Sequence, residues 1–243
     1  MKATEIIINK ERNAVLTAYI QKTESEFSNI KKRPAIIVLP GGGYEFCSDR
    51  EADPVAFVYL RAGFQVFVLR YSVAEHKAWQ NPLNDYEKTY KLICENSKEW
   101  AVDTDKIAVI GFSAGGHLAG CAATVSSCKP QAAILGYPVL NRVTTDWYST
   151  SAPDVVNSVD ENTCPCFIFA SRNDNTVPIE NTVEFLAALN KNGVGYECHI
   201  YSNAPHGFSV ADETVNADPN MCSRAPHWTA DSVAWLKETL NIF

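Results

Sequence analysis

The sequence predicts an α/β fold in which a mostly parallel sheet of about eight strands is flanked by helices on both faces. Runs of β character alternate with segments of helical spacing along the chain, which is typical of this class. Residues 35–39 form a continuous apolar run, as expected of a strand buried on both faces. The chain has 243 residues, 46% of them hydrophobic and 20% charged, so we expect one soluble domain over residues 1–243.

The expected elements follow one another without repeats. Strands are expected over residues 5–9, 14–21, 35–39, 65–71, 107–110, 131–137, 167–171 and 196–201, the first two as a hairpin. Helices are expected over residues 54–62, 82–100, 178–192 and 230–240, with a further helix after Ser113. Gly63 and Gly193 end two of them, and Asp103-Thr104-Asp105 is expected to turn the chain into the strand before Ser113.

Composition and charge exclude several classes of protein. The net charge is −7 and the one basic cluster, Lys31-Lys32-Arg33, is expected in a solvated loop, so no nucleic-acid partner is predicted. The N-terminal residues have the pattern of neither an export signal nor a membrane span. We therefore expect no membrane partner and a cytoplasmic protein, or a secreted one if a signal peptide was removed. The sequence leaves a homo-oligomer open.

The eight cysteines are expected to be reduced and mostly buried, because a domain of this size needs no disulfides. Cys164-Pro165-Cys166 has the wrong spacing for a zinc site, so no metal is predicted. The glycine triplet at residues 41–43 lacks the Lys and Ser/Thr of a phosphate loop, so no cofactor is predicted.

The chain is organised around residues 106–124, KIAVIGFSAGGHLAGCAAT. A short apolar run leads into Gly111-Phe112-Ser113-Ala114-Gly115, and a segment of small residues with helical character follows. This is the pattern of a strand, a sharp turn and a helix with a nucleophilic serine at the apex, where side chains two residues on either side would collide with the turn.

A serine hydroxyl needs a base and a group that orients the base. His206 and Asp174 both follow strands, as do Ser113 and the glycine triplet, so all four are expected at one edge of the sheet. The chain order Ser, Asp, His is the order of α/β-hydrolases. Asp174 alone could instead be an ordinary turn or helix cap. The other histidines are expected to be structural or solvated: His76, His117, His199 and His227.

These residues together resemble the α/β-hydrolase superfamily of esterases and lipases, and more narrowly small acetyl esterases and acetyl xylan esterase-like carbohydrate esterases. The resemblance covers about residues 30–240. It is carried by residues 40–44 (PGGGY), 48–51 (SDRE), 70–73 (RYSV), 111–119 (GFSAGGHLA), Asp174 with Val177-Pro178, and residues 206–208 (HGF).

The resemblance implies that Ser113 is the nucleophile, His206 the general base and acid, and Asp174 its orienting carboxylate. The oxyanion hole would be the N–H groups of Ala114, Gly42 and Gly43. Pro40 stands where relatives more often have histidine, which leaves open how the glycine loop is braced. A short lid is expected over residues 141–162, and aromatic residues that line either the pocket or the core are Tyr44, Phe46, Trp79, Trp147 and Phe208.

The predicted activity is hydrolysis of short-chain carboxylic esters, such as acetyl groups on xylan-derived oligosaccharides or other sugars. The predicted partner is thus a small-molecule or oligosaccharide ester. A peptidase of the prolyl-oligopeptidase type uses the same triad, but normally with a large extra domain for which this chain is too short. A non-catalytic binding protein of the same fold is the alternative of another class.

Overall fold

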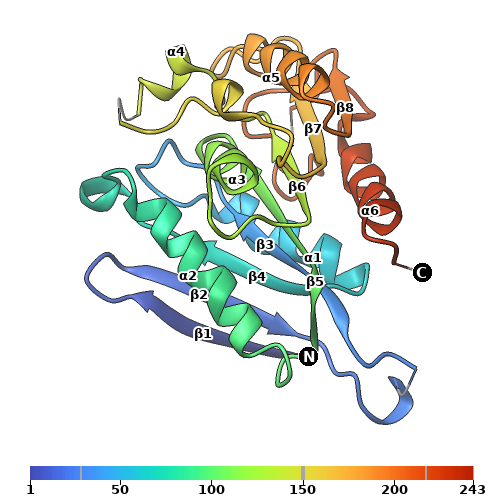
Figure 1. Ribbon diagram of the computed structural model, residues 1–243. Helices are drawn as coiled ribbons and strands as arrows, with labels where there is room; N and C mark the ends of the chain where they lie inside the picture. The colour runs from blue at the N-terminus through green and yellow to red at the C-terminus, as the bar shows by residue number, and fades with distance from the viewer. Residues whose placement is uncertain (28, 149–150, 217, 243) are drawn as a thin grey trace.

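A twisted eight-stranded sheet forms the centre of the protein (Figure 1). The computed structural model describes residues 1–27, 29–148, 151–216 and 218–242. The strand order is β1-β2-β4-β3-β5-β6-β7-β8. The pairs β1–β2 and β2–β4 are antiparallel, and all pairs from β4 to β8 are parallel. The strands are β1 Lys2–Asn9, β2 Ala14–Ile20, β3 Arg33–Leu39, β4 Gln65–Arg70, β5 Val102–Phe112, β6 Ala132–Gly136, β7 Cys166–Ser171 and β8 Tyr196–Tyr201.

Helices cover both faces of the sheet and give two separate hydrophobic cores. One core packs beneath α2, α3 and α5, and the other beneath α1 and α6. The α-helices are α1 Asp53–Arg61, α2 Asn81–Glu95, α3 Ala114–Thr124, α4 Arg142–Thr145, α5 Glu180–Lys191 and α6 Trp228–Thr239. Short 3-10 helices are η1 Ser25–Phe27, η2 Asp49–Glu51, η3 Ala74–His76, η4 Val156–Ser158 and η5 Ala225–His227. The predicted fold class is confirmed.

The central strands explain why the sequence folds in this way. Along β3, Ile36 and Val38 belong to one core while Ile37 and Leu39 belong to the other, and all four are fully buried. A strand buried on both faces has no solvated side, so its sequence is a continuous apolar run. The helix α3 lies close to the sheet because its residues are mostly Gly and Ala, and every one of its residues is buried.

Three expectations about element bounds and surroundings were wrong. The helix expected over residues 82–100 is α2, which ends at Glu95, and turns follow it to residue 101. Residues 103–105, which were expected to form a turn, lie within β5. The first residue of β5, Val102, pairs with Arg33 of β3. Arg33 is buried at the start of β3, and its guanidinium donates to the carbonyls of Gly63 (3.2 Å) and Lys22 (3.1 Å), whereas Lys31 and Lys32 are exposed.

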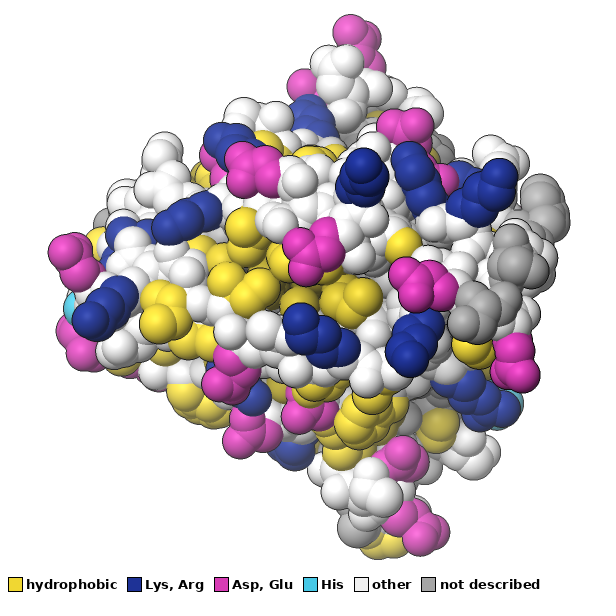
Figure 2. Space-filling model, turned by 90° about the horizontal axis from the view of Figure 1, so that it is seen from below, with side chains coloured by type: hydrophobic (Ala, Val, Ile, Leu, Met, Phe, Trp, Pro, Cys, Tyr) yellow, Lys and Arg dark blue, Asp and Glu magenta, His cyan; other side chains and the backbone are white. Residues whose placement is uncertain are grey.

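The segment over residues 141–162 contains only the short helices α4 and η4, as expected of a small lid, and its residues 149–150 lie outside the described residues. Seen from below, the molecule shows apolar side chains between acidic and basic ones, with no continuous basic stripe on this face (Figure 2). No helix in the described part of the chain has the length and apolar character needed to cross a membrane.

Candidate active site

The turn between β5 and α3 presents Ser113. Its backbone has φ 53° and ψ −116°, a conformation that costs a non-glycine residue energy and is found mainly at functional sites. A Cβ on Gly111 would lie 2.0 Å from the carbonyl oxygen of Gly115, and a Cβ on Gly115 would lie 2.2 Å from that of Leu39. Both distances are far too short for a side chain, so the turn requires glycine at both positions.

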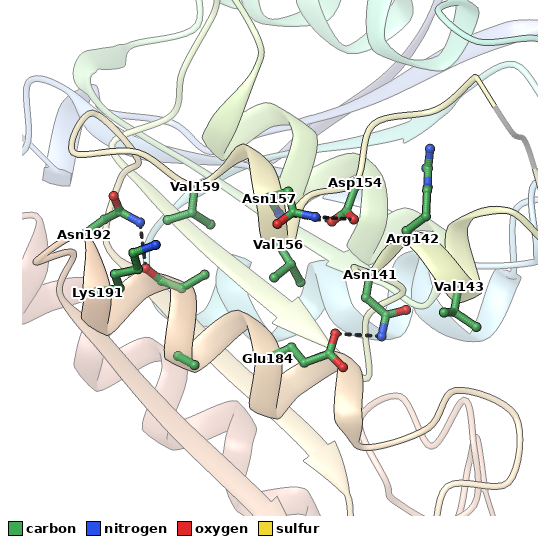
Figure 3. A pocket seen from close by; sticks show the side chains of 12 residues that line it. Asn141, Arg142, Val143, Asp154, Val156, Asn157, Val159, Glu184, Lys191 and Asn192 are labelled. Carbon is green, nitrogen blue, oxygen red and sulfur yellow. Dashed lines mark hydrogen bonds between the residues drawn. The ribbon is translucent and has the colours of Figure 1, made fainter.

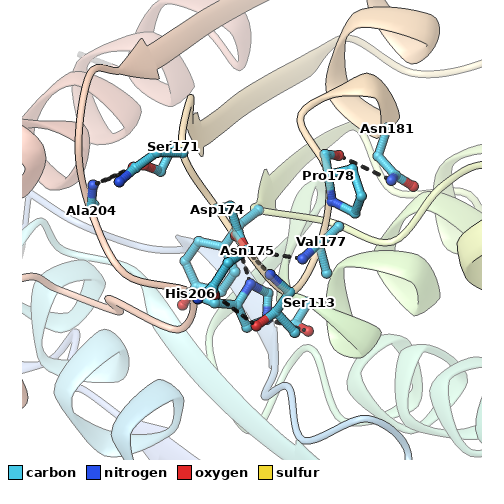
Figure 4. Close-up of polar contacts among 12 residues, drawn as sticks. Ser113, Ser171, Asp174, Asn175, Val177, Pro178, Asn181, Ala204 and His206 are labelled. Carbon is cyan, nitrogen blue, oxygen red and sulfur yellow. Dashed lines mark hydrogen bonds and ion pairs between the residues drawn. The ribbon is translucent and has the colours of Figure 1, made fainter.

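Ser113, His206 and Asp174 form a continuous chain of hydrogen bonds (Figure 4). His206 Nε2 lies 2.9 Å from Ser113 Oγ, and His206 Nδ1 lies 2.7 Å from Asp174 Oδ2. The three side chains come from the loops after β5, β7 and β8, which end at the same edge of the sheet. The structure therefore brings together the three residues that the sequence places after separate strands.

The second oxygen of the Asp174 carboxylate is held by the backbone. Asp174 Oδ1 accepts the N–H groups of Thr176 at 2.8 Å and Val177 at 2.9 Å. The Asp174 side chain is 2% exposed, against 18% for His206. Each carboxylate oxygen thus has its own donors, and the orientation of the carboxylate toward Nδ1 is fixed.

The glycine triplet follows β3 and lies against the Ser113 turn. A Cβ on Gly41 would lie 3.1 Å from Ser113 Cβ, and the Gly41 N–H is already donated to Glu51 Oε2 at 2.7 Å. Within the described residues the N–H groups of Gly42, Gly43 and Ala114 have no hydrogen-bond acceptor. They remain the candidates for an oxyanion hole, while Gly41 has another role.

The aromatic residues considered for the pocket divide into two groups. Phe208 is fully buried, with its ring centroid 4.9 Å from that of Tyr137, and Tyr44 is 4% exposed within the core. Of the two alternatives left open for these side chains, pocket or core, their burial favours the core. Phe46 and Trp147 are 59% and 55% exposed and stay candidates for contact with substrate, while Trp79 is partly buried against the core.

The other histidines have structural or surface surroundings, as expected. His117 is buried, with Nδ1 2.8 Å from the Tyr44 hydroxyl and Nε2 2.9 Å from the Pro153 carbonyl. Burial lowers the pKa of His117 to about 4, so its ring is neutral and Nε2–H donates to Pro153. His199 pairs with Glu197, and His76 lies near Glu75 at the surface.

Three residues of the site carry no role in the sequence-based prediction. Glu51 and Tyr137 are buried and hydrogen bonded to each other at 2.6 Å next to the triad. Tyr148, from the lid segment, lies over the glycine loop, with Cε1 3.2 Å from the position of a Cβ on Gly43. The signal for Glu51 was its place in residues 48–51 of the resemblance, and the signal for Tyr137 was its place directly after a strand.

A cavity of about 590 Å³ lies between the lid segment and α5 (Figure 3). Its lining includes Asn141, Asp154, Asn157 and Glu184, and it contains none of the triad residues. All eight cysteines are free, and no cluster of metal-ligating side chains occurs within the described ranges.

Two family models match adjoining parts of the chain. BD-FAE matches residues 24–130, which include the glycine loop and Ser113, and the prolyl oligopeptidase family matches residues 144–242, which include Asp174 and His206. Among curated proteins, an endo-1,4-beta-xylanase B of Butyrivibrio fibrisolvens is 32% identical over 75% of this chain and 33% of its own length. An acetylxylan esterase of Xylanibacter ruminicola is 29% identical over 72% of this chain. The chain spans only 33% and 41% of the length of these two relatives.

Solved structures match over almost the whole chain. An acetyl ester-xyloside bifunctional hydrolase from Caldicellulosiruptor lactoaceticus has 29% identity and a TM-score of 0.82, covering 95% of this chain and 89% of that one. MGS-M1, an alpha/beta hydrolase enzyme from a Medee basin deep-sea metagenome library, has 38% identity and a TM-score of 0.93, covering 100% and 99%. With this identity over the full length of both chains, and with the same fold, the chain belongs to the α/β-hydrolase family.

Proposed function

We propose that the protein is a serine esterase that hydrolyses short-chain carboxylic esters through an acyl-enzyme on Ser113. The observation that carries this proposal is the hydrogen-bonded chain from Ser113 Oγ through His206 to Asp174, with distances of 2.9 and 2.7 Å. Such an arrangement activates a hydroxyl for attack on a carbonyl carbon.

The chemistry follows from the atoms in this chain. His206 Nε2 takes the proton of Ser113 as Oγ bonds to the ester carbonyl carbon, and the carbonyl oxygen becomes an oxyanion. The proposed donors to this charge are the N–H groups of Ala114, Gly42 and Gly43, which have no other acceptor within the described residues. In other hydrolases, loss of one such donor costs about 3 kcal/mol. The intermediate collapses, and His206 gives its proton to the departing alcohol oxygen.

Hydrolysis of the acyl-enzyme repeats these steps with water. His206 removes a proton from water as the water oxygen attacks the acyl carbon, and then returns the proton to Ser113 Oγ as the carboxylic acid leaves. Throughout, Asp174 Oδ2 accepts Nδ1–H and keeps the His206 nitrogen that faces Ser113 able to accept a proton.

We propose acetyl groups on xylan-derived oligosaccharides or other sugars as the substrate class. Two relatives support this, since one is named an acetylxylan esterase and one an acetyl ester-xyloside hydrolase. The small lid favours an open site for short acyl groups. Phe46 and Trp147 are exposed aromatic side chains on the glycine loop and the lid segment, and flat aromatic surfaces suit the apolar face of a sugar ring.

We also propose that the protein acts in a reducing compartment, the cytoplasm. All eight cysteines are free, which suits the cytoplasm better than an oxidising environment.

The test is acetate release from acetylated xylo-oligosaccharides by the wild type, Ser113→Ala and Ser127→Ala. Ser127 is an exposed serine outside the site, so its variant should keep wild-type turnover while Ser113→Ala releases no acetate above buffer. Equal turnover by wild type and Ser113→Ala would contradict the nucleophile.

The prolyl oligopeptidase match to residues 144–242 makes a peptidase the second candidate. A parallel assay with a prolyl p-nitroanilide peptide separates the two. Faster cleavage of the anilide than of p-nitrophenyl acetate would replace the esterase by the peptidase.

A further inference from the structure

Glu51 is a buried carboxylate beneath the catalytic loops. It ends η2 and is 3% exposed. Within the described residues, no Lys or Arg side chain lies within ion-pair distance of it. A buried carboxylate without an ion pair costs several kcal/mol unless donors satisfy it, so its hydrogen bonds need to be accounted for.

Both oxygens of Glu51 accept hydrogen bonds from loops of the active site. Oε2 accepts the Gly41 N–H at 2.7 Å, and Oε1 accepts the Tyr137 hydroxyl at 2.6 Å. The Tyr137 oxygen in turn accepts the Ser209 N–H at 3.1 Å, so its own proton is left for Glu51. One carboxylate therefore connects the glycine loop, the loop after β6 and the loop that carries His206.

We propose that Glu51 is a positioning residue for the esterase reaction, which fixes the glycine loop against the Ser113 turn and places a negative charge behind His206. This inference rests on the proposed function, because it assigns Glu51 a part in the same reaction.

The first half of the inference concerns the oxyanion loop. Gly41 directly precedes Gly42 and Gly43, whose N–H groups are the candidate oxyanion donors. The Gly41 N–H is held by Glu51, and the Gly41 carbonyl accepts the Ser48 N–H at 2.9 Å, so its peptide groups are fixed on both sides. Glu51 therefore holds the glycine loop in place through the Gly41 N–H.

The second half concerns charge. Tyr137 lies between Glu51 and the catalytic histidine, with its ring centroid 5.1 Å from that of His206. A Cβ on Gly207 would lie 3.9 Å from Glu51 Oε1, so the carboxylate is next to the His206 loop. When His206 takes the proton of Ser113, the positive charge that develops is attracted by Asp174 and by Glu51.

Both donors to Glu51, the Tyr137 hydroxyl and the Gly41 N–H, stabilise an ionised carboxylate. Burial raises the pKa of Glu51 above its ordinary value, and the hydrogen bonds from Tyr137 and Gly41 and the charges of His206 and Arg50 oppose this rise without cancelling it. The titratable groups that face it from the packed elements are Arg50 on η2, Cys47 on the glycine loop, Tyr71 after β4, Tyr137 after β6 and His206 after β8.

The experiment compares Glu51→Gln, Glu51→Ala and the control Asp49→Asn in steady-state hydrolysis of p-nitrophenyl acetate between pH 5 and 9. Asp49 lies two residues away with its side chain 90% exposed, so Asp49→Asn removes a charge from the same segment without touching the site. Gln keeps the shape and an oxygen for the Gly41 N–H but removes the charge. Thermal unfolding of each variant shows whether it is folded.

We expect Glu51→Gln to lower kcat about tenfold and Glu51→Ala to lower it about a hundredfold. Removal of a whole oxyanion donor lowers kcat by about 10²- to 10³-fold, so the first loss is smaller than that and the second is close to it. KM should change less than about threefold, since Glu51 does not contact substrate. The acid limb of the kcat/KM profile of Glu51→Gln should move to lower pH, because a nearby negative charge favours a protonated histidine. Asp49→Asn should match the wild type.

Two results would overturn the inference. One is a folded Glu51→Gln variant with kcat within twofold of the wild type. The other is a loss of kcat with the acid limb unmoved, which would reduce Glu51 to packing. A wild-type protein without esterase activity would instead refute the proposed function, so the two failures are distinguishable.

Discussion

The two oxygens of the Asp174 carboxylate accept from different donors, and this division determines what Asp174→Asn would do. Oδ1 accepts the N–H groups of Thr176 and Val177, and Oδ2 accepts from His206 Nδ1. An asparagine keeps both backbone bonds only if its oxygen stays at the Oδ1 position. Turning the amide over would lose two hydrogen bonds of about 1 kcal/mol each. The NH2 group of the introduced asparagine is therefore expected to face His206.

An NH2 group at that position donates to Nδ1, so the proton of the imidazole moves to Nε2. The nitrogen that faces Ser113 can then no longer accept the serine proton. We expect kcat to fall about 10³- to 10⁴-fold with KM nearly unchanged, equivalent to about 4 to 5.5 kcal/mol in the barrier.

The assay is steady-state hydrolysis of p-nitrophenyl acetate, with Asp212→Asn as the matched control. Asp212 is exposed and accepts the Thr214 N–H at 2.9 Å in a similar turn, but it lies outside the triad. Wild-type kcat is expected for Asp212→Asn. A kcat within tenfold of wild type for Asp174→Asn would refute the assignment of Asp174 and the tautomer reasoning with it.

Three further predictions concern stability and reactivity. Gly115→Ala should lower activity and reduce the free energy of unfolding by about 1 to 3 kcal/mol, because the new Cβ would lie 2.2 Å from the Leu39 carbonyl oxygen. Urea denaturation measures this loss, and unchanged stability would contradict the packing of the turn. Burial lowers the pKa of His117 to about 4, so as the pH falls below about 6.5 the unfolded chain takes up a proton that the folded protein does not yet bind. The free energy of unfolding therefore decreases as the pH falls from about 6.5 toward 4. Between pH 7 and 4 the wild type should lose about 3 kcal/mol more than His117→Gln in urea titrations, and parallel curves would refute it. Iodoacetamide should alkylate Cys222 before Cys121, because a backbone hydrogen bond from Arg224 lowers the pKa of Cys222 whereas burial raises the pKa of Cys121. Mass spectrometry of a time course measures the order, and earlier alkylation of Cys121 would contradict the prediction.

The sequence predicted those features that depend on local patterns. Continuous apolar runs identify strands such as β3, because a strand buried on both faces allows no polar side. The Gly-Xaa-Ser-Xaa-Gly turn is readable for the same reason, since its glycines are required by contacts of 2.0 and 2.2 Å. Asp174 and His206 could be placed near Ser113 because all three follow parallel strands of one sheet.

The features that were missed or left open depend on contacts between distant segments. Phe208 follows the catalytic histidine by two residues, and nothing in its neighbours tells whether it faces substrate or the core; its packing on Tyr137 decides this. Glu51 reaches Gly41 and Tyr137, which are 10 and 86 residues away in sequence. The start of β5 at Val102 follows from its pairing with Arg33, which no local pattern shows.

The most direct test of the central claim is to trap the acyl-enzyme. Wild-type protein mixed with p-nitrophenyl acetate and quenched in acid should carry one acetyl group on the peptide that contains Ser113, and this label should disappear as substrate is exhausted. Ser113→Ala should carry no acetyl group that turns over. Turnover without acetylation of Ser113, or an acetyl group that forms and decays on another residue, would contradict the account.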